Sequence, residues 1–264
     1  MKLTFVCIGN DEFEHIQELL PQLKALADEV IYVDCESKDG SYEFAQNLGI
    51  RVLQKTRHMN ANINRSAAFE VATGDWIFYA DPDERFPKAI IEDLKLKIAK
   101  NPEAKGFKLA RKNYYFGCWL RYGGQYPDNQ LRIFKRGFGS FANQHVHERL
   151  IVNGAVGTLD VAMEHYPYLN ISQFMKKFDF YSTFEAKFLH QQNEKVNFKN
   201  HIKYLVLKPH NRFIRRYIFK RGFMDGIPGF FAAFFDAVGW MTRYFKLWEI
   251  QKDEIQKNES EKKS

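Results

Sequence analysis

The chain has 264 residues, of which 45% are hydrophobic and 27% are charged, so it can form a globular protein with an ample core. This length suits one large domain, or one domain with a substantial appendage. The three cysteines, Cys7, Cys35 and Cys118, are odd in number and widely spaced, which excludes a disulfide framework and a zinc-finger pattern. No secretory leader pattern precedes Ile8, so we expect a cytoplasmic protein.

The net charge of +7 is concentrated in the C-terminal third of the chain. From Asn170 onward there are 18 Lys or Arg residues against 10 Asp or Glu, whereas the preceding residues hold 21 against 22. A basic balance is compatible with binding nucleic acid, but no nucleic-acid-binding motif is present. We therefore expect no nucleic-acid partner and look for another anionic one.

Strand and helix patterns alternate along the N-terminal part. Strands are predicted at 3–8, 30–34, 51–53 and 76–80, and helices at 13–26, 41–48 and 60–72. This alternation predicts a parallel sheet with helices on both faces. Pro21 lies inside the first helical pattern, where we expect a kink or a break. No Gly-x-Gly-x-x-Gly follows the first strand, which disfavours a dinucleotide-binding Rossmann domain.

The strand at 76–80 ends in three carboxylates, Asp81, Asp83 and Glu84, with Pro82 between the first two. Proline cannot continue a central strand, so the carboxylates lie at its carboxyl end, where open α/β sheets bind their ligands. Crowded carboxylates favour a hard cation such as Mg²⁺ or Mn²⁺, which reaches proteins through carboxylates and substrate phosphates. The sequence therefore predicts a metal–diphosphate site here, and a solvated acidic turn is the alternative.

Further patterns predict a helix at 87–100 and strands at 106–115 and 130–134. The loop 114–124 is rich in aromatic and glycine residues, which can stack on sugar rings or pack beneath the loop. His145 and His147 fall on one face of a strand and can form a metal pair, although no third ligand is evident nearby. Glu148 is better suited to act as a general base.

The C-terminal region combines basic and aromatic residues. Residues 196–224 contain eight Lys or Arg and no acidic residue, and 227–248 are strongly aromatic. Asp236, Arg243 and Lys246 interrupt the second stretch, so it does not read as a membrane span. We expect it to associate with an anionic membrane surface, with a helical cover for the sheet or an oligomer interface as alternatives. Residues 251–264 are polar and are expected to be disordered.

The combined motifs resemble glycosyltransferase family 2, in particular the bacterial lipopolysaccharide-core β-1,4-glucosyltransferases. The matching segments cover nearly the whole chain: Asp34 with Ser37-x-Asp39-Gly40, Asn64, 72–76, Asp81-x-Asp83-Glu84, 113–117, 126–132, 146–149, 165–166, 221–230 and 246–249. The resemblance implies an α/β protein of the GT-A fold, with a mostly parallel central sheet and a C-terminal helical extension. It divides the chain into a catalytic domain at 1–168, a basic aromatic helical region at 169–250 and a tail at 251–264.

The resemblance also implies roles for single residues. Asp34 would contact the uracil or ribose of a UDP-sugar, and Asp39, Asn64 and Asp81 would complete the nucleotide-sugar site. Asp81 and Asp83 would hold the divalent cation, Mg²⁺ or Mn²⁺, that bridges the diphosphate. Glu148 would deprotonate the acceptor hydroxyl. The implied acceptor-binding residues are Tyr114, Trp119 and Arg132.

The implied reaction is an inverting transfer of a hexose, glucose being favoured, from a UDP-sugar to a lipopolysaccharide inner-core acceptor, which forms a β-glycosidic bond. The implied partners are a lipid-linked acceptor and the inner membrane surface, where the protein would be peripheral, and a homo-oligomer is a further option. Two alternatives stay open. One is transfer to a polyprenyl phosphate or a surface polysaccharide; the other is a catalytically degenerate membrane-binding module, because Cys35 and Glu36 replace the small residues usual after the first aspartate.

Overall fold

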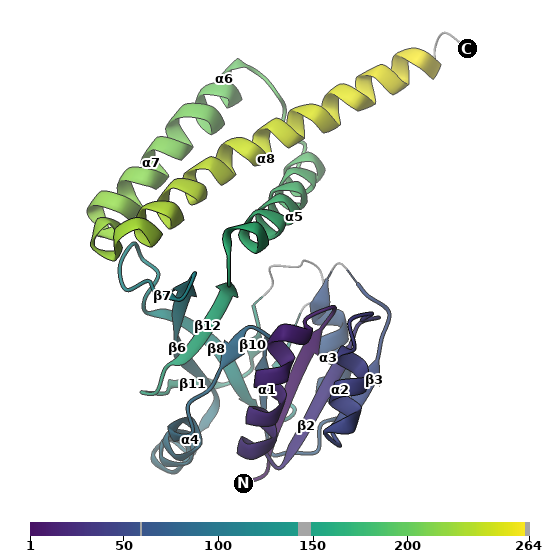
Figure 1. Ribbon diagram of the computed structural model, residues 1–264, viewed down its shortest axis with the longest axis vertical. Coiled ribbons are helices and arrows are strands. Elements are labelled where there is room, and N and C mark those ends of the chain that lie inside the picture. The colour runs from purple at the N-terminus through teal and green to yellow at the C-terminus, as the bar shows by residue number, and fades with distance from the viewer. Residues whose placement is uncertain (59, 142–148, 262–264) are drawn as a thin grey trace. The chain divides into compact units, whose positions relative to one another are not determined.

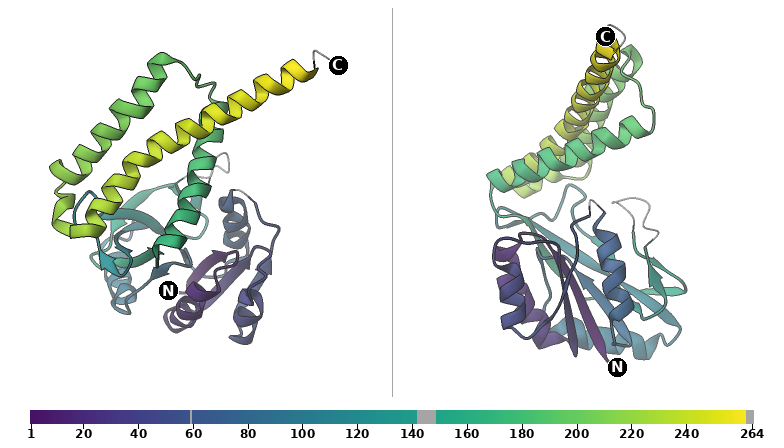
Figure 2. Two further views of the ribbon diagram at one scale, coloured as in Figure 1. Left: turned by 45° about the horizontal axis from the view of Figure 1, so that its top comes forward. Right: turned by 90° about the vertical axis from the view of Figure 1, so that its right-hand side faces the viewer.

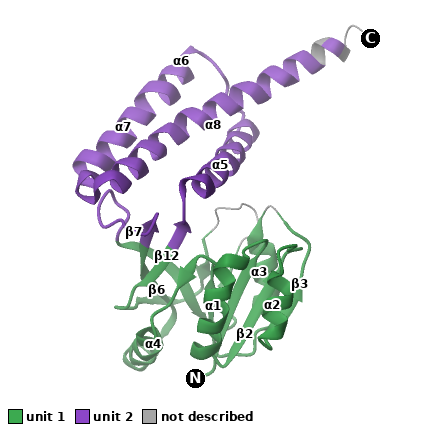
Figure 3. Cartoon of the chain, in the orientation of Figure 1, with its two compact units in different colours: residues 1–112, 127–165 green, residues 113–126, 166–264 purple. Residues whose placement is uncertain are grey.

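The computed structural model describes residues 1–58, 60–141 and 149–261. They form two compact units (Figure 3). Unit 1 comprises residues 1–112 and 127–165, and unit 2 comprises residues 113–126 and 166–264. The aromatic loop 114–124 thus belongs to the same unit as the C-terminal helices.

Four parallel strands form the first half of the main sheet (Figure 1). They lie in the order β3-β2-β1-β4, with bounds Leu3–Gly9 for β1, Glu29–Asp34 for β2, Arg51–Gln54 for β3 and Trp76–Ala80 for β4. The sequence predicted all four to within about a residue or two. Because β1 lies centrally between β2 and β4, the carboxyl ends of these three strands meet at one edge of the sheet.

The second half of the sheet is mixed. β8 (Asp128–Lys135) runs antiparallel to β4, and β6 (Ala104–Tyr115) runs antiparallel to β8. The order continues through β12 (Met163–Tyr168) to β5 (Glu84–Arg85). The short strands β7 (Cys118–Trp119) and β11 (Ala155–Thr158) pair with β6, and β9 (Gly139–Ser140) pairs with β10 (Ile151–Val152) in a separate small sheet.

Helices cover both faces of the sheet, as predicted, because alternate residues of β1 point to opposite sides. Phe5 and Cys7 pack in a cluster with α1 (Phe13–Leu26), α2 (Ser41–Asn47) and α4 (Ala89–Lys100). Val6 and Ile8 pack in a second cluster with α3 (Ala61–Val71). Of the kink or break expected at Pro21, the break does not occur: α1 continues through the proline, whose fixed φ is close to that of a helix.

Unit 2 contains long helices that run side by side (Figures 1 and 2). α5 (Ile171–Gln191) packs on α8 (Gly226–Glu261), and so does the segment made of α6 (Phe198–His201), η1 (Ile202–Leu207), α7 (Lys208–Ile214) and η2 (Arg215–Phe219). η1 and η2 are π-helical, and the 3₁₀ turn η3 (Gly222–Asp225) leads into α8. No helix among the described residues is long and apolar enough to cross a membrane.

The aromatic residues of this region build its interior. Phe174 packs edge-on against Phe231 and Phe235, with ring centroids 4.7 and 5.0 Å away. Tyr204 and Tyr244 stack in parallel at 5.0 Å in a second cluster. The polar segment expected to be disordered from 251 is instead helical as far as Glu261. It continues a helix that is already nucleated, and its Glu, Lys and Gln residues are good helix formers.

The amino ends of β1, β2 and β4 are joined by a buried hydroxyl. Thr4 is fully buried, and its Oγ1 donates to Glu29 Oε2 at 2.6 Å and accepts from the Gly74 N–H at 2.9 Å. Glu29 also accepts hydrogen bonds from Thr73. Burial tends to raise the pKa of Glu29, but these hydrogen bonds outweigh it and hold the pKa below its usual value.

We expect Thr4→Val to lower the free energy of unfolding by about 1–3 kcal/mol at neutral pH, because the buried Gly74 N–H loses its acceptor. The depressed pKa of Glu29 contributes stability above the ordinary glutamate pKa, and this contribution disappears as the pH falls through the folded-state pKa. The loss should therefore be smaller in acid. Urea unfolding at both pH values measures it, with Thr4→Ser as the control that keeps the hydroxyl. Equal stability of the Val and Ser variants would contradict this role.

Candidate active site

The candidate site lies at the carboxyl edge of β2, β1 and β4. In the registers of these strands Asp34 is opposite Gly9, and Ala80 is opposite Cys7. Asp34 is the last residue of β2, and Asp81 follows the last residue of β4. The two carboxylates flank the end of β1. The sequence predicted that Asp81 lies at the carboxyl end of its strand, and the strand order places Asp34 at the same edge.

Asp34 is a buried carboxylate with one oxygen left unused. It is 2% exposed, and Oδ2 lies 3.4 Å from the Ser37 N–H. Oδ1 has no hydrogen-bond partner among the described residues. Because a buried oxygen without a partner is costly, it is suited to accept a hydrogen bond from a ligand.

The loops that surround Asp34 are tied to one another. Asp11 N–H donates to Ser37 Oγ at 3.1 Å, and Lys38 N–H donates to Asp11 Oδ1 at 2.7 Å. Asp11 and Glu36 both adopt positive φ, at 53° and 63°. Non-glycine residues hold this conformation only where their surroundings enforce it. The loops after β1 and β2 are therefore fixed together beside Asp34.

Asp39 and Asn64 both make hydrogen bonds within the protein. Asp39 accepts from the N–H groups of Phe13 and Ser41, at 2.8 and 3.0 Å, and so joins the first residues of α1 and α2. Burial tends to raise the pKa of Asp39, but hydrogen bonds from Ser41 and Phe13 hold it below its usual value. Asn64 Nδ2 donates to Thr56 O at 2.9 Å and to Cys35 Sγ at 3.2 Å.

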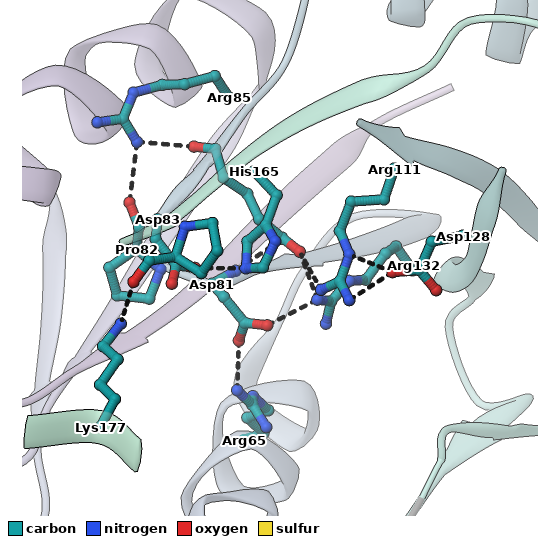
Figure 4. A network of polar contacts seen from close by, with 12 residues as sticks. Arg65, Asp81, Pro82, Asp83, Arg85, Arg111, Asp128, Arg132, His165 and Lys177 are labelled. Atoms are coloured by element: carbon teal, nitrogen blue, oxygen red, sulfur yellow. Dashed lines mark hydrogen bonds and ion pairs between the residues drawn. The ribbon is translucent and has the colours of Figure 1, made fainter. Parts of the chain in front are cut away.

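Two arginines hold Asp81 (Figure 4). Arg132 donates to Oδ2 at 2.6 Å, and Arg65 donates to Oδ1. Both guanidinium groups also lie over the ring of Tyr79, with Cζ 4.4 and 5.6 Å from its centroid. Burial tends to raise the pKa of Asp81, but the charges of Arg132 and Arg65 hold it well below its usual value. Asp81 is therefore ionised and already neutralised within the protein.

Arg132 also binds Glu84, which is fully buried. Arg132 Nη2 lies 2.5 Å from Glu84 Oε1, and the Asp81 N–H donates to Oε2 at 2.9 Å. Burial raises the pKa of Glu84 even though Arg132 opposes the shift. Arg111 lies 3.7 Å from Glu84 and donates to Asp128 at 2.6 Å, which extends the network (Figure 4). Arg132 is therefore the centre of a buried cluster of charges.

Asp83 occupies a different environment, beside an imidazole. β5 pairs with β12 so that Glu84 is opposite His165, and His165 Nε2 lies 3.5 Å from Asp83 Oδ1. Among the described residues, no three His, Cys, Asp or Glu side chains gather into a metal-holding group. A carboxylate oxygen and an imidazole nitrogen are atom types that bind divalent cations in proteins.

The three residues expected to bind the acceptor are divided between the two units. Tyr114 and Trp119 belong to unit 2, where Tyr114 stacks on Tyr166 at 4.8 Å and the Arg121 guanidinium lies 4.5 Å from the Trp119 ring centroid. Arg132 belongs to unit 1, is 4% exposed and bridges Asp81 and Glu84. Its guanidinium group thus contacts two carboxylates of the protein itself. Glu148, with His145 and His147, lies outside the described residues.

Sequence reasoning missed the counter-charges of the acidic corner. Arg65 lies on α3 and Arg132 and Arg111 on neighbouring strands, all far from Asp81 in sequence. One weak signal was present: in a strand at 130–134, Arg132 falls on the same face as Phe134, and an arginine on a buried face needs an acidic partner. His165 was noted only as part of a motif, and its position beside Asp83 depends on the pairing of β5 with β12.

A protein-family model described as "Glycosyl transferase family 2" matches residues 10–156, more than half of the chain. The chain belongs to glycosyl transferase family 2. The family resemblance drawn from the sequence motifs is thereby confirmed, and so is the GT-A fold class with its C-terminal helices. As a member of this family the protein is a glycosyltransferase.

Relatives of similar length are known. An uncharacterized glycosyltransferase of Rickettsia typhi is 26% identical over 264 residues, which cover 94% of this chain and 86% of that protein. The lipopolysaccharide core biosynthesis glycosyltransferase LpsC of Rhizobium meliloti is 27% identical over 258 residues, covering 93% and 91%. Among solved structures, residues 1–349 of S. aureus TarS align over 97% of this chain and 92% of that one, with 13% identity and a TM-score of 0.48.

We expect Arg132→Met to lower the free energy of unfolding by about 3–5 kcal/mol at neutral pH, because it leaves Asp81 and Glu84 buried without their shared counter-charge. The depressed pKa of Asp81 contributes stability above the ordinary aspartate pKa, and this contribution is lost as the pH falls through the folded-state pKa. The variant lacks most of this contribution, so its deficit should shrink in acid.

Urea unfolding of the variant and the parent chain measures both effects. Arg136→Met is the matched control, because Arg136 follows the same strand but is exposed, and its effect should stay within about 0.5 kcal/mol. Adding Glu84→Gln to Arg132→Met should restore part of the stability. A loss below about 1 kcal/mol at neutral pH would show that Arg132 does not hold the corner together.

Proposed function

We propose that this glycosyltransferase moves a hexose, glucose in the first instance, from a UDP-sugar to a lipopolysaccharide inner-core acceptor and inverts the anomeric configuration. The observation that carries the proposal is the placement of Asp34, with its unused buried oxygen, at the same sheet edge as Asp81 and Asp83. A nucleoside has hydrogen-bond donors for the Asp34 carboxylate, and a diphosphate with a bound cation suits the region of Asp81 and Asp83.

Asp34 is proposed to recognise the nucleoside. A carboxylate can accept hydrogen bonds from the N3–H of uracil and from the ribose hydroxyls. Hydrogen bonds to a charged acceptor are stronger than those between neutral groups. Asp39 and Asn64 act on the same site indirectly, because they fix the starts of α1 and α2 and the loops after β2 and β3. We thus assign them as positioning residues rather than as direct ligands of the nucleotide.

Asp83 and His165 would hold the divalent cation, Mg²⁺ or Mn²⁺. When bound, the cation would supply positive charge to the diphosphate as the sugar departs. Asp81 has a different proposed role, because Arg65 and Arg132 already neutralise it. It orients these arginines and fixes the turn that carries Asp83.

Glu148 is the proposed general base. A single displacement needs a group that takes the proton from the acceptor hydroxyl on the face opposite the leaving diphosphate. Glu148 occupies the base position of the family motif Val146-His147-Glu148-Arg149. An α-linked donor then gives a β-linked product.

The acceptor is proposed from similarity and from chemistry. LpsC, a lipopolysaccharide core biosynthesis glycosyltransferase, resembles this chain over 93% of its length, which supports the same class of acceptor. Tyr114 and Trp119 offer ring faces of the kind that stack on sugars. Because such an acceptor is anchored in lipid, we place the protein at the inner membrane surface, with 1–168 as the catalytic region and 169–250 as the region that meets the membrane.

Binding of UDP with and without Mn²⁺, measured by calorimetry, tests the donor site without relying on turnover. Asp83→Asn should abolish the gain in affinity that Mn²⁺ gives the parent chain, because a neutral amide is a poor ligand for a hard cation. Asp34→Asn should weaken UDP binding by about tenfold or more whether or not Mn²⁺ is present, because it replaces a charge-assisted hydrogen bond.

Asp253→Asn is the control for both variants, since Asp253 is exposed on α8. It should bind UDP as the parent chain does. If the parent chain bound UDP equally with and without Mn²⁺, the cation would have no place in the proposed donor site. If no sugar nucleotide bound at all, the proposal as a whole would fail.

We expect Glu148→Gln to reduce transfer by about a hundredfold or more while UDP affinity is unchanged, because the amide cannot accept the hydroxyl proton. The assay is sugar transfer to an isolated lipopolysaccharide core acceptor, with NMR assignment of the new linkage and Glu92→Gln as an exposed control. A product that retained the α configuration would contradict the single displacement. Full activity of the Glu148 variant would remove its role as base.

A further inference from the structure

The end of the helical hairpin in unit 2 exposes a cluster of large apolar side chains. We call residues 218–227 the tip; it spans the end of η2, the turn η3 and the start of α8 (Figures 1 and 2). Phe219 is 79% exposed and Ile227 is 84% exposed. About half of each of Ile218, Phe223 and Met224 is also exposed. Single exposed apolar residues are ordinary, but a contiguous group of this size marks an interaction surface.

The backbone of the tip is fixed, so the exposure is built into the fold. The Asp225 carboxylate accepts from the N–H groups of Tyr122 and Arg121, at 2.8 and 3.1 Å, and the Gly123 N–H donates to Lys220 O at 2.8 Å. Arg221 adopts a positive φ of 56°. A side chain at Gly222 would meet Arg216 O at 2.8 Å, so only glycine fits there. The tip therefore holds its apolar side chains outward in a defined arrangement.

An apolar stripe leads along the hairpin to the tip. Phe198, Ile202, Val206 and Ile218 are exposed, and they fall on positions that repeat every four residues. In a regular α-helix this spacing drifts around the axis. The π-helical turns η1 and η2 rotate less per residue than the α-helical turns, so they offset that drift and help to keep the stripe on one face. Phe198 is 78% exposed at its far end.

The exposed charge around this surface is almost wholly basic, because the one acidic residue of the tip, Asp225, is half-buried and accepts hydrogen bonds from backbone N–H groups. Between Lys195 and Met224 the sequence holds no acidic residue. Arg212 and Arg216 are paired with Asp236 on α8, so they contribute little outward charge. Lys199, Arg215, Lys220 and Arg221, by contrast, are exposed among the apolar residues. Long basic side chains of this kind can keep their charge at a polar boundary while neighbouring apolar groups are buried.

We propose that the tip and the stripe dock the protein on a bilayer that contains anionic lipids, with Phe219 and Ile227 inserted among the headgroups. Exposed aromatic and aliphatic residues interleaved with Lys and Arg fit such a surface. A protein interface fits less well, because Lys is depleted from interface cores. In one respect this inference rests on the proposed function: a lipid-linked acceptor would lie at the same surface. The docking itself does not require catalysis.

Co-sedimentation of the full chain with vesicles tests the docking directly. Binding to equimolar phosphatidylcholine and phosphatidylglycerol should exceed binding to phosphatidylcholine alone and should weaken as salt is added. Phe219→Ser with Ile227→Ser should weaken binding to the anionic vesicles by about tenfold or more. The control is Leu96→Ser with Ile255→Ser, which should bind like the parent chain; these two apolar residues, on α4 and the distal part of α8, are 59% and 58% exposed.

A second pair of variants tests the charge. Arg215→Glu with Lys220→Glu should weaken vesicle binding by about fivefold or more for each charge removed. The control is Lys88→Glu with Lys100→Glu, at the two ends of α4. It changes the net charge by the same amount and should have a small effect on vesicle binding. Circular dichroism confirms that each variant is folded. If both pairs of charge variants weakened binding equally, general attraction rather than this surface would explain it.

Two results would overturn the proposal. The first is that the parent chain does not bind anionic vesicles, or that the folded Phe219→Ser, Ile227→Ser variant binds them as well as the parent chain does. The other is a vesicle-free parent chain that sediments as an oligomer and becomes monomeric in that variant, which would assign the surface to a second copy. UDP binding by the same variants separates this inference from the proposed function: normal vesicle binding without UDP binding would refute only the latter.

Discussion

The interaction on which the site depends is the contact of Arg132 with Asp81 and Glu84. Two carboxylates in this position would repel each other, and Glu84 is fully buried, so the turn after β4 can form only if a cation inside the protein faces both. β8 supplies that cation because it runs antiparallel beside β4, with Ile133 opposite Phe78 and the neighbouring Arg132 lying over Tyr79. The mixed half of the sheet thus stabilises the acidic end of its parallel half. Asp83 lies on the turn that this contact stabilises.

The same arrangement recurs in the helical unit, where Asp236 on α8 faces Arg212 and Arg216. Asp236 offsets part of the charge of these two arginines, while Lys199, Arg215, Lys220 and Arg221 remain exposed. The positive charge of the C-terminal third is therefore sorted into paired charges that hold helices together and exposed charges available to a partner. A count of basic residues along the sequence cannot make this distinction, because it depends on which arginines face α8.

Several residues of the family motifs have structural contacts that account for their types. Asp39 bonds to the first N–H groups of α1 and α2, and Asn64 ties the segment after β3 to Cys35. The small residues usual after the first aspartate are replaced here by Cys35 and Glu36, and the structure accommodates the change: Cys35 is buried against Asn64, and Glu36 takes a positive φ in a loop held by its neighbours. At this edge Asp39 and Asn64 thus fix the loops, whereas Asp34 Oδ1 has no hydrogen-bond partner among the described residues.

The sequence by itself determined the strands and helices of the parallel half almost to the residue, and it placed Asp34 and Asp81 at the carboxyl ends of their strands. Both follow from local properties: apolar runs form buried strands, proline ends them, and alternation with helices makes them parallel. It also identified the family, because the motifs cover most of the chain. Only the tertiary structure decided that Arg65 and Arg132 neutralise Asp81, that His165 lies beside Asp83, and that Arg132 is buried and contacts both Asp81 and Glu84. It likewise decided which basic residues of the C-terminal third are paired. Each of these contacts joins residues far apart in the chain, and no local pattern encodes which strand will lie next to which.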